Sequence, residues 1–154
     1  SKEVPDGMTA AWSCPFDPDV LLLVLDKEHT TSENIRHTKK FVVALPCEEQ
    51  KKTALDLGSV HGRDVGNKLQ IKDVKTEKSQ KFGLDVMSGA LAYFECELQD
   101  EKLFEEKGIC LSKVVNVYVK DDCWDDKEEC FNPGIKRTLH HVAGSTFCSG
   151  GDLV

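Results

Sequence analysis

The chain has 154 residues, enough for one domain with a substantial core, and its 20 Lys and Arg against 27 Asp and Glu give a net charge of −7. This acidic balance argues against a dedicated nucleic-acid or anionic-membrane binder, because phosphate binding needs clustered positive charge. The longest apolar run has six residues, at 20–25, and is too short to span a bilayer. We expect no secretory signal, because the chain does not open with a basic and then apolar leader.

Strand patterns dominate along the chain. The apolar run at 20–25 is suited to a buried strand, and a second run at 41–45 is stopped by a proline. Residues 91–98 alternate, and the charges at Glu95 and Glu97 predict that one face of this strand becomes solvated toward its far end. The β-branched stretch 109–119 predicts a long strand. Shorter extended pieces are expected at 8–14 and 139–147.

Two helices are expected, at 32–40 and 48–57. The first begins with an N-cap residue type and an early acid and ends in bases, and the second carries acids before its lysines. Strands outnumber helices, and strands and helices do not alternate regularly. This pattern favours an antiparallel barrel or an α+β fold over a doubly wound sheet. No repeat or linker divides the chain, so we expect 1–154 to form a single domain.

Seven cysteines are spread over the whole length, without a C-x-x-C pair. The odd count favours reduced thiols and a cytoplasmic location. Cys96 and Cys110 lie in apolar stretches and are expected to be small core residues. Cys123 and Cys130 are the closest pair, and a disulfide or a metal site there stays an alternative; we expect no metal.

The chemistry of residues 30–32 points to a phosphate site on physical grounds alone. Thr30, Thr31 and Ser32 bring three hydroxyls to the start of the first helix, where backbone N–H groups are free and the helix dipole is positive. Such a start is suited to a phosphate group. A plain N-cap, which needs only one of the hydroxyls, is the other interpretation.

Several short motifs, in order, resemble the flavin reductase-like, FMN-binding split-barrel family. They cover nearly the whole chain: Met8-Thr9-Ala10-Ala11-Trp12, Asp26-Lys27-x-His29-Thr30-Thr31-x-x-Asn34-Ile35, Phe41-Val42-Val43, Gly62-Arg63-Asp64-Val65 with Lys68, Ala92-Tyr93-Phe94-Glu95-Cys96, Val114-Val115-x-Val117, and Leu139-His140-His141-x-x-Gly144-x-x-Phe147. Each motif is weak alone, and their order and spacing carry the resemblance.

The resemblance implies a mainly β fold, an antiparallel split β-barrel with a few short helices, which forms a homodimer and binds one FMN per subunit near the dimer interface. It places the residues of the Met8–Trp12 motif along the isoalloxazine ring. It also implies a phosphate site, with Lys68 adding a positive charge, and an aromatic contact to the ring. The cofactor-binding residues expected in this way are Met8, Thr9, Ala10, Ala11, Trp12, Thr30, Thr31, Ser32, Lys68 and Phe147. For Trp12 and Phe147, burial in the core is the alternative.

Three departures from the family pattern stand out. Only about seven residues precede the Met-Thr motif, so the family's first strand is expected to be missing from the given chain, or the barrel to close differently. Asp6 stands where the family has Asn, either close to the flavin or as a solvated residue of the chain start. Lys107 stands where the family tends to have His. The last two departures bear on reduction chemistry more than on FMN binding.

The function that the resemblance implies is NAD(P)H-dependent flavin reduction, or electron transfer of the flavoredoxin type. A nicotinamide, NADH or NADPH, would pass a hydride to the flavin, and the electrons would leave to free flavin or to a redox protein partner. We name no catalytic residue, because hydride transfer to a flavin does not require an acid or base. The alternatives are a non-enzymatic FMN-binding protein and a dimeric interaction module on the same barrel. No nucleic-acid or membrane partner is expected.

Overall fold

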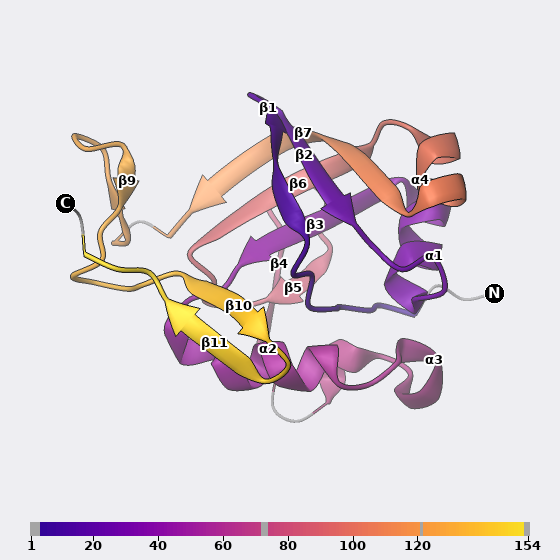
Figure 1. Ribbon diagram of the computed structural model, residues 1–154, viewed down its shortest axis with the longest axis horizontal. Coiled ribbons are helices and arrows are strands. Elements are labelled where there is room, and N and C mark those ends of the chain that lie inside the picture. Colours follow the sequence, from indigo (N-terminus) through magenta and orange to yellow (C-terminus); the bar gives the residue numbers. More distant parts are fainter. Residues whose placement is uncertain (1–3, 72–73, 121, 153–154) are drawn as a thin grey trace.

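A five-stranded antiparallel sheet forms the centre of the computed structural model, which describes residues 4–71, 74–120 and 122–152 (Figure 1). Its strand order is β1-β2-β7-β6-β3. The strands are β1 (Ser13–Asp17), β2 (Val20–Val24), β3 (Lys40–Leu45), β6 (Ala92–Leu98) and β7 (Ile109–Val119). Among the described strands, β1 and β3 have a neighbour on one side only, so the sheet is open at both edges.

Three two-stranded sheets and several short helices surround the central sheet. The pairs are β4 (Thr76–Lys78) with β5 (Asp85–Met87), β8 (Trp124–Asp125) with β9 (Cys130–Phe131), and β10 (Leu139–Ala143) with β11 (Thr146–Ser149). The helices are α1 (Thr30–Thr38), α2 (Lys51–Gly58), α3 (Gly62–Val65) and α4 (Glu101–Lys107), with 3-10 turns η1 (Glu48–Gln50) and η2 (Lys68–Gln70). In Figure 1, α2 and α3 lie along one side of the central sheet, and α4 lies at one end of it.

The sequence pattern predicted the main elements correctly. Strands β2, β3, β6 and β7 form where apolar and β-branched runs were expected, and β10 and β11 divide the expected piece at 139–147 into a hairpin. Both expected helices are present, although the first begins two residues early, at Thr30. The fold is therefore mainly β and antiparallel with a few short helices, as expected.

The extended piece expected at 8–14 is only partly a strand. Pairing begins where the carbonyl of Trp12 accepts a hydrogen bond from the Val24 N–H at 2.9 Å, and β1 follows from Ser13. Upstream, the Thr9 hydroxyl donates to the carbonyl of Ala54 in α2. The segment before β1 is thus held by a helix, and it lies beside the sheet rather than in it.

The core cluster joins the central sheet to α1 and α4. Leu23, Leu25, Ile35, Phe104 and Cys110 are buried together. Cys96 and Cys110 are fully buried, as expected for small core residues, and burial raises their thiol pKa values to about 11 and about 12. All seven cysteines lie in the described part of the chain and are free thiols.

The expectation that Glu95 lies on a solvated face of its strand is wrong. The Glu95 side chain is fully buried, because donors from the β4–β5 hairpin and from β7 surround its carboxylate. Glu97, two residues further on, is half-exposed and lies 3.9 Å from the Lys40 ammonium.

Candidate functional site

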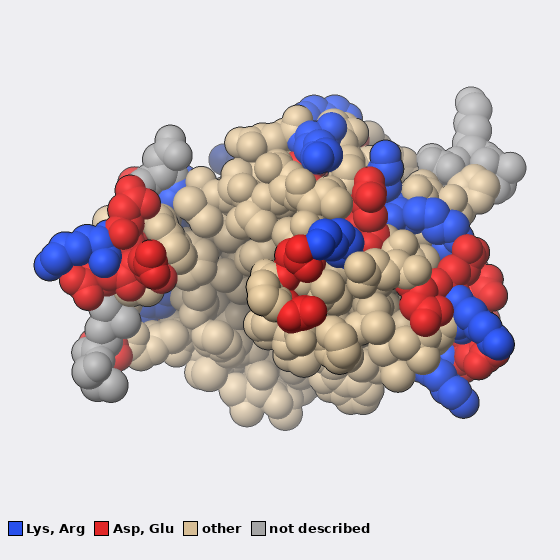
Figure 2. All heavy atoms as spheres, turned by 90° about the horizontal axis from the view of Figure 1, so that it is seen from above, with Lys and Arg blue, Asp and Glu red and all other residues tan. Residues whose placement is uncertain are grey.

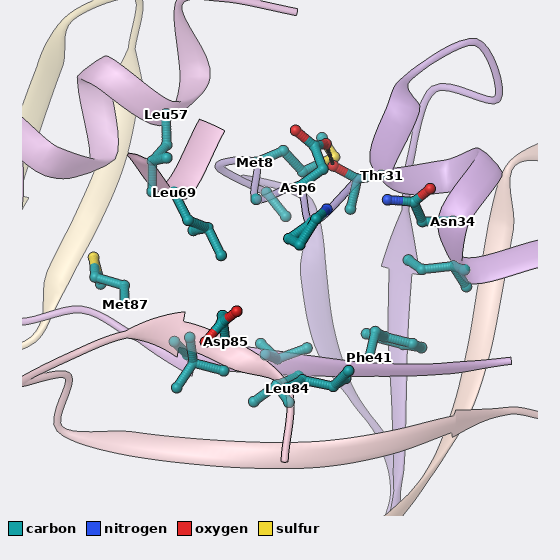
Figure 3. A pocket seen from close by; sticks show the side chains of 18 of the residues that line it. Asp6, Met8, Thr31, Asn34, Phe41, Leu57, Leu69, Leu84, Asp85 and Met87 are labelled. Atoms are coloured by element: carbon teal, nitrogen blue, oxygen red, sulfur yellow. Dashed lines mark hydrogen bonds between the residues drawn. The ribbon is translucent and has the colours of Figure 1, made fainter. Parts of the chain in front are cut away.

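A cavity of about 490 Å³ lies between the segment before β1, helix α1 and strands β3 and β5 (Figure 3). Leu57 and Leu69 face it from one side, and Leu84 and Met87 from the opposite side. Met8 and Phe41 also line it, so most of its wall is apolar. This volume and lining are typical of sites for small organic ligands.

A smaller chamber of about 110 Å³ adjoins the cavity at the start of α1. The two spaces share wall residues, among them Met8, Thr9 and Thr31. The chamber is more polar: His29, Thr30, His61 and Lys68 line it, together with backbone at Gly58 and Gly62. The site as a whole therefore offers a large apolar space that continues into a small polar one.

The start of α1 leaves donors available in this chamber. The N-cap residue is His29, and no side chain of the described residues caps the first turn. The first N–H groups of a helix have no partner within the helix, and they carry the positive end of its dipole. Thr30 Oγ1 accepts a hydrogen bond from the Arg63 N–H at 3.1 Å, which leaves the hydroxyl proton for a ligand.

The Ser32 hydroxyl is not one of these donors. Its side chain is fully buried, and its hydroxyl donates to the Asp26 carbonyl at 2.6 Å. Because the helix begins at Thr30, Ser32 stands in the first turn and faces the preceding loop. A contact of Ser32 with the phosphate stays a prediction, and its hydroxyl is already used to hold the turn before α1.

Asp6 is a buried member of the chamber. Its side chain is 1% exposed, so the alternative of a solvated residue at the chain start is wrong. Oδ2 accepts a hydrogen bond from the Thr31 hydroxyl, and Figure 3 shows the two side chains pointing toward each other. Oδ1 lies 3.8 Å from the Lys68 ammonium, whose side chain is 6% exposed.

Gly62 makes room for this carboxylate. A Cβ at position 62 would lie 2.5 Å from Asp6 Oδ1 and 3.1 Å from the Cβ of Thr30. A contact of 2.5 Å does not occur and one of 3.1 Å is tight, so a larger residue would displace Asp6 or helix α1. Glycine here lets the helices and the segment before β1 meet around the chamber.

The opposite wall of the cavity depends on buried Glu95. Its carboxylate accepts hydrogen bonds from the N–H of Lys81 at 2.9 Å, the N–H of Phe82 at 2.8 Å and the Asn116 amide at 2.6 Å. Burial by itself raises the pKa of this carboxyl, but the hydrogen bonds together outweigh burial and lower the pKa. Gly83 and Leu84, next in the hairpin, line the cavity, so Glu95 fixes this wall.

The structure brings together six of the ten expected site residues. Met8, Thr9, Ala10 and Thr31 line the larger cavity, and Thr30 and Lys68 line the polar chamber. Ser32 lies behind the helix start. The remaining three, Ala11, Trp12 and Phe147, lie outside both spaces.

The three outlying residues differ in exposure. Ala11 is exposed, and Trp12 is 71% exposed, so core burial of Trp12 is wrong. Phe147 is half-buried against the His141 ring, with centroids 5.3 Å apart. Their contact with a flavin stays a prediction. Lys107 is exposed at the end of α4 and lies outside both spaces.

Sequence reasoning missed the β5 wall and the histidines of the chamber. Residues 83–87 contribute to the cavity although they lie outside the motifs that resemble the family. His29 and His61 have ring centroids 5.5 Å apart, and His29 Nδ1 is buried without a hydrogen-bond partner among the described residues. His29 stood in the motif beside the threonines, so its position was the available signal.

The visible surface carries charges of both signs (Figure 2), and the helices of the described residues are short or polar. On the face seen in Figure 2, basic and acidic side chains lie next to one another at both ends and near the centre. Within residues 4–71, 74–120 and 122–152, every helix is too short or too polar to cross a membrane.

Comparisons with known proteins agree with one another. The sequence model of the flavin reductase like domain matches residues 1–139. An uncharacterized protein of Escherichia coli strain K12, YddH, is 30% identical over 151 residues, which cover 96% of this chain and 79% of that protein.

Solved structures show the same fold. An FMN-binding domain of a flavin reductases-like enzyme from Shewanella baltica has a TM-score of 0.90 and 26% identity, covering 100% of this chain and 83% of that one. The flavoredoxin of Desulfovibrio vulgaris has a TM-score of 0.78 and 16% identity, covering 98% and 85%. These likenesses confirm the expected split-barrel class.

Proposed function

Because this chain belongs to the flavin reductase-like domain family, we propose that it is an FMN-binding flavoprotein that accepts electrons from NADH or NADPH. It passes them to free flavin or to a redox protein. The observation that carries the proposal is the pair of adjoining spaces, one apolar and one polar, at the start of α1. FMN has the matching construction, a flat aromatic ring system joined by a flexible chain to a phosphate.

The residues of the site fit this group. The uncapped first turn of α1 offers N–H donors, Thr30 keeps a free hydroxyl proton, and Lys68 supplies a buried positive charge. His29 Nδ1, which has no hydrogen-bond partner in the described part of the chain, is a further polar atom of the chamber. Met8, Thr9 and Ala10 line the apolar space, where the ring system would lie.

Bound FMN would supply two-electron chemistry by accepting a hydride. The chain's own part is placement. The apolar wall around Leu57, Leu69 and Leu84 excludes water from the ring. The Thr9 hydroxyl, bonded to the Ala54 carbonyl, holds the segment before β1 against α2, and so fixes the position of Met8.

We also propose that the protein acts as a homodimer. Every residue of edge strand β1 is exposed, and Trp12 and Phe16 are 71% and 61% exposed. Large aromatic side chains in this state are typical of protein interfaces. A second copy on this face would cover Trp12 and bring it toward a flavin. Light scattering tests this: a particle of 17.2 kDa at micromolar concentration with FMN present would refute it.

Flavin titration tests the binding site. FMN should bind more tightly than riboflavin, which lacks the phosphate. Thr30→Val should weaken FMN about ten-fold or more and leave riboflavin unchanged, because the Thr30 hydroxyl proton is not used within the described residues and a charged hydrogen bond contributes about 1.5–3 kcal/mol. The matched control is Thr146→Val, at an exposed position of β11 outside both spaces. Equal affinity of the parent protein for FMN and riboflavin would refute the phosphate assignment.

Steady-state oxidation of NADH and NADPH tests the reductase activity. A protein that binds FMN and oxidises neither nucleotide would be the non-enzymatic flavin carrier, and the reductase proposal would be withdrawn. A protein that stays colourless with FMN would instead be an interaction module on this barrel.

A further inference from the structure

We propose that Asp6 is a built-in competitor for phosphate at this site, and that its carboxylate lowers the preference of the protein for phosphorylated over unphosphorylated flavin. This inference rests on the proposed function, and it assigns to the site a feature that regulates its selectivity. The carboxylate occupies the polar chamber and engages the donors that a ligand phosphate would use.

Two contacts define the competition. The Thr31 hydroxyl donates to Asp6 Oδ2, and the Lys68 ammonium lies 3.8 Å from Oδ1. Both charged side chains are more than nine-tenths buried. A phosphate in the chamber must therefore take Thr31 and Lys68 from a group of its own charge sign.

One oxygen of the Asp6 carboxylate lacks a hydrogen bond from the described residues. Oδ1 is buried and has no hydrogen-bond partner among the described residues. Natural proteins leave few buried polar atoms in this state, because each one costs free energy. The unsatisfied oxygen stands at the wall shared by the two spaces, next to Gly62 and Thr30. A carboxylate oxygen accepts hydrogen bonds, so a donor from a ligand hydroxyl or a moved side chain would complete its hydrogen bonding, whereas a phosphate oxygen would only compete with it.

The size of the effect follows from the charges. A like charge at about 5 Å would reduce affinity about 300-fold at an effective dielectric constant near 20. Lys68 pairs with the carboxylate and cancels much of this repulsion. We expect about a ten-fold loss of phosphate affinity. It comes from the repulsion that remains and from the Thr31 hydroxyl, which donates to Asp6 and not to the phosphate. FMN would then still bind more tightly than riboflavin, by a reduced margin, and would exchange readily.

The experiment compares dissociation constants of FMN and riboflavin in low salt, where screening is weak. In Asp6→Asn, the ratio of the riboflavin constant to the FMN constant should rise about ten-fold. The control is Asp64→Asn, which removes the same charge at an exposed position outside both spaces, and its ratio should stay within two-fold of the parent. An unchanged or lower ratio in Asp6→Asn would overturn the inference.

A second measurement uses inorganic phosphate alone, with Asp6→Ser as an additional variant if the Asn protein folds poorly. Phosphate should raise the Tm of the Asp6 variant more than that of the parent or of Asp64→Asn. Equal shifts in all of these proteins count against the inference. Failure of the proposed function looks different: neither flavin binds any of the proteins, while the phosphate shifts still decide the role of Asp6.

Discussion

Substitution of the buried Glu95 tests how the cavity wall is held. In Glu95→Gln, one carboxylate oxygen becomes an NH₂ group, which then faces the N–H of Lys81 or the amide of Asn116. At least one charged hydrogen bond is lost and one buried donor is left unsatisfied, each worth about 1.5–3 kcal/mol. Relief of charge burial offsets part of this loss. We expect destabilisation of about 3 kcal/mol and a Tm lower by about 6–12 °C.

The pH dependence of stability gives a second measure of what the Glu95 carboxylate contributes to the folded protein. The pKa of Glu95 is lowered in the folded protein, so its contribution is fully present above the ordinary glutamate pKa of about 4.3 and is lost as the pH falls through the lowered value. Parent stability should therefore decline in acid below about pH 4.3. The variant has no carboxyl at this position, and its decline in the same range should be shallower.

Urea unfolding followed by tryptophan fluorescence measures both effects. The matched control is Glu97→Gln on the same strand, where the carboxylate is half-exposed and 3.9 Å from Lys40, and we expect a change below about 0.5 kcal/mol. The Glu95 variant should also bind flavin more weakly. Glu95 holds the β4–β5 hairpin, and Gly83 and Leu84 of this hairpin line the cavity. A Glu95 variant as stable as the Glu97 control would refute the reasoning.

Two further predictions concern packing. Gly108→Ala should destabilise the protein by more than 1 kcal/mol relative to Gly144→Ala, as measured by urea unfolding. Both glycines have positive φ, but a Cβ at 108 would lie 2.5 Å from the Leu25 carbonyl oxygen, whereas nothing lies within 4 Å at 144. Thiol labelling at pH 8 should modify exposed Cys148 rapidly and Cys110 only after unfolding. The reason is that Cys110 is buried and that burial raises its thiol pKa to about 12. Equal labelling rates of the two thiols would contradict this prediction.

The parts of the fold that were predictable depend on local chemistry. Strand β2 is an apolar run, β7 is a long β-branched run, and α1 has its acid early and its bases late. These patterns act over a few residues, so the sequence displays them directly. The segment before β1 looked equally extended, but its conformation is set by the contact of Thr9 with α2, 45 residues later.

The candidate site was predictable where a motif coincides with a helix start. Thr30 and Thr31 combine hydroxyl groups with the free N–H groups of α1, and this combination is visible in the sequence. Glu95 was not predictable, because its donors come from Lys81 and Phe82 on one side and from Asn116 on the other. A glutamate in a strand is exposed in most proteins, so the local pattern pointed the wrong way.

Comparison of the two buried carboxylates separates a structural role from a ligand-binding role. Both oxygens of Glu95 accept hydrogen bonds, and the result is a closed arrangement that can only hold its hairpin. Asp6 accepts one hydrogen bond, from Thr31, while its Oδ1 lies 3.8 Å from the Lys68 ammonium and accepts no hydrogen bond from the described residues. Burial costs both groups solvation, and Glu95 receives more hydrogen bonds from the described residues to offset that cost. We therefore expect a bound phosphate to change the contacts among Asp6, Thr31 and Lys68. Glu95 keeps the opposite wall in place.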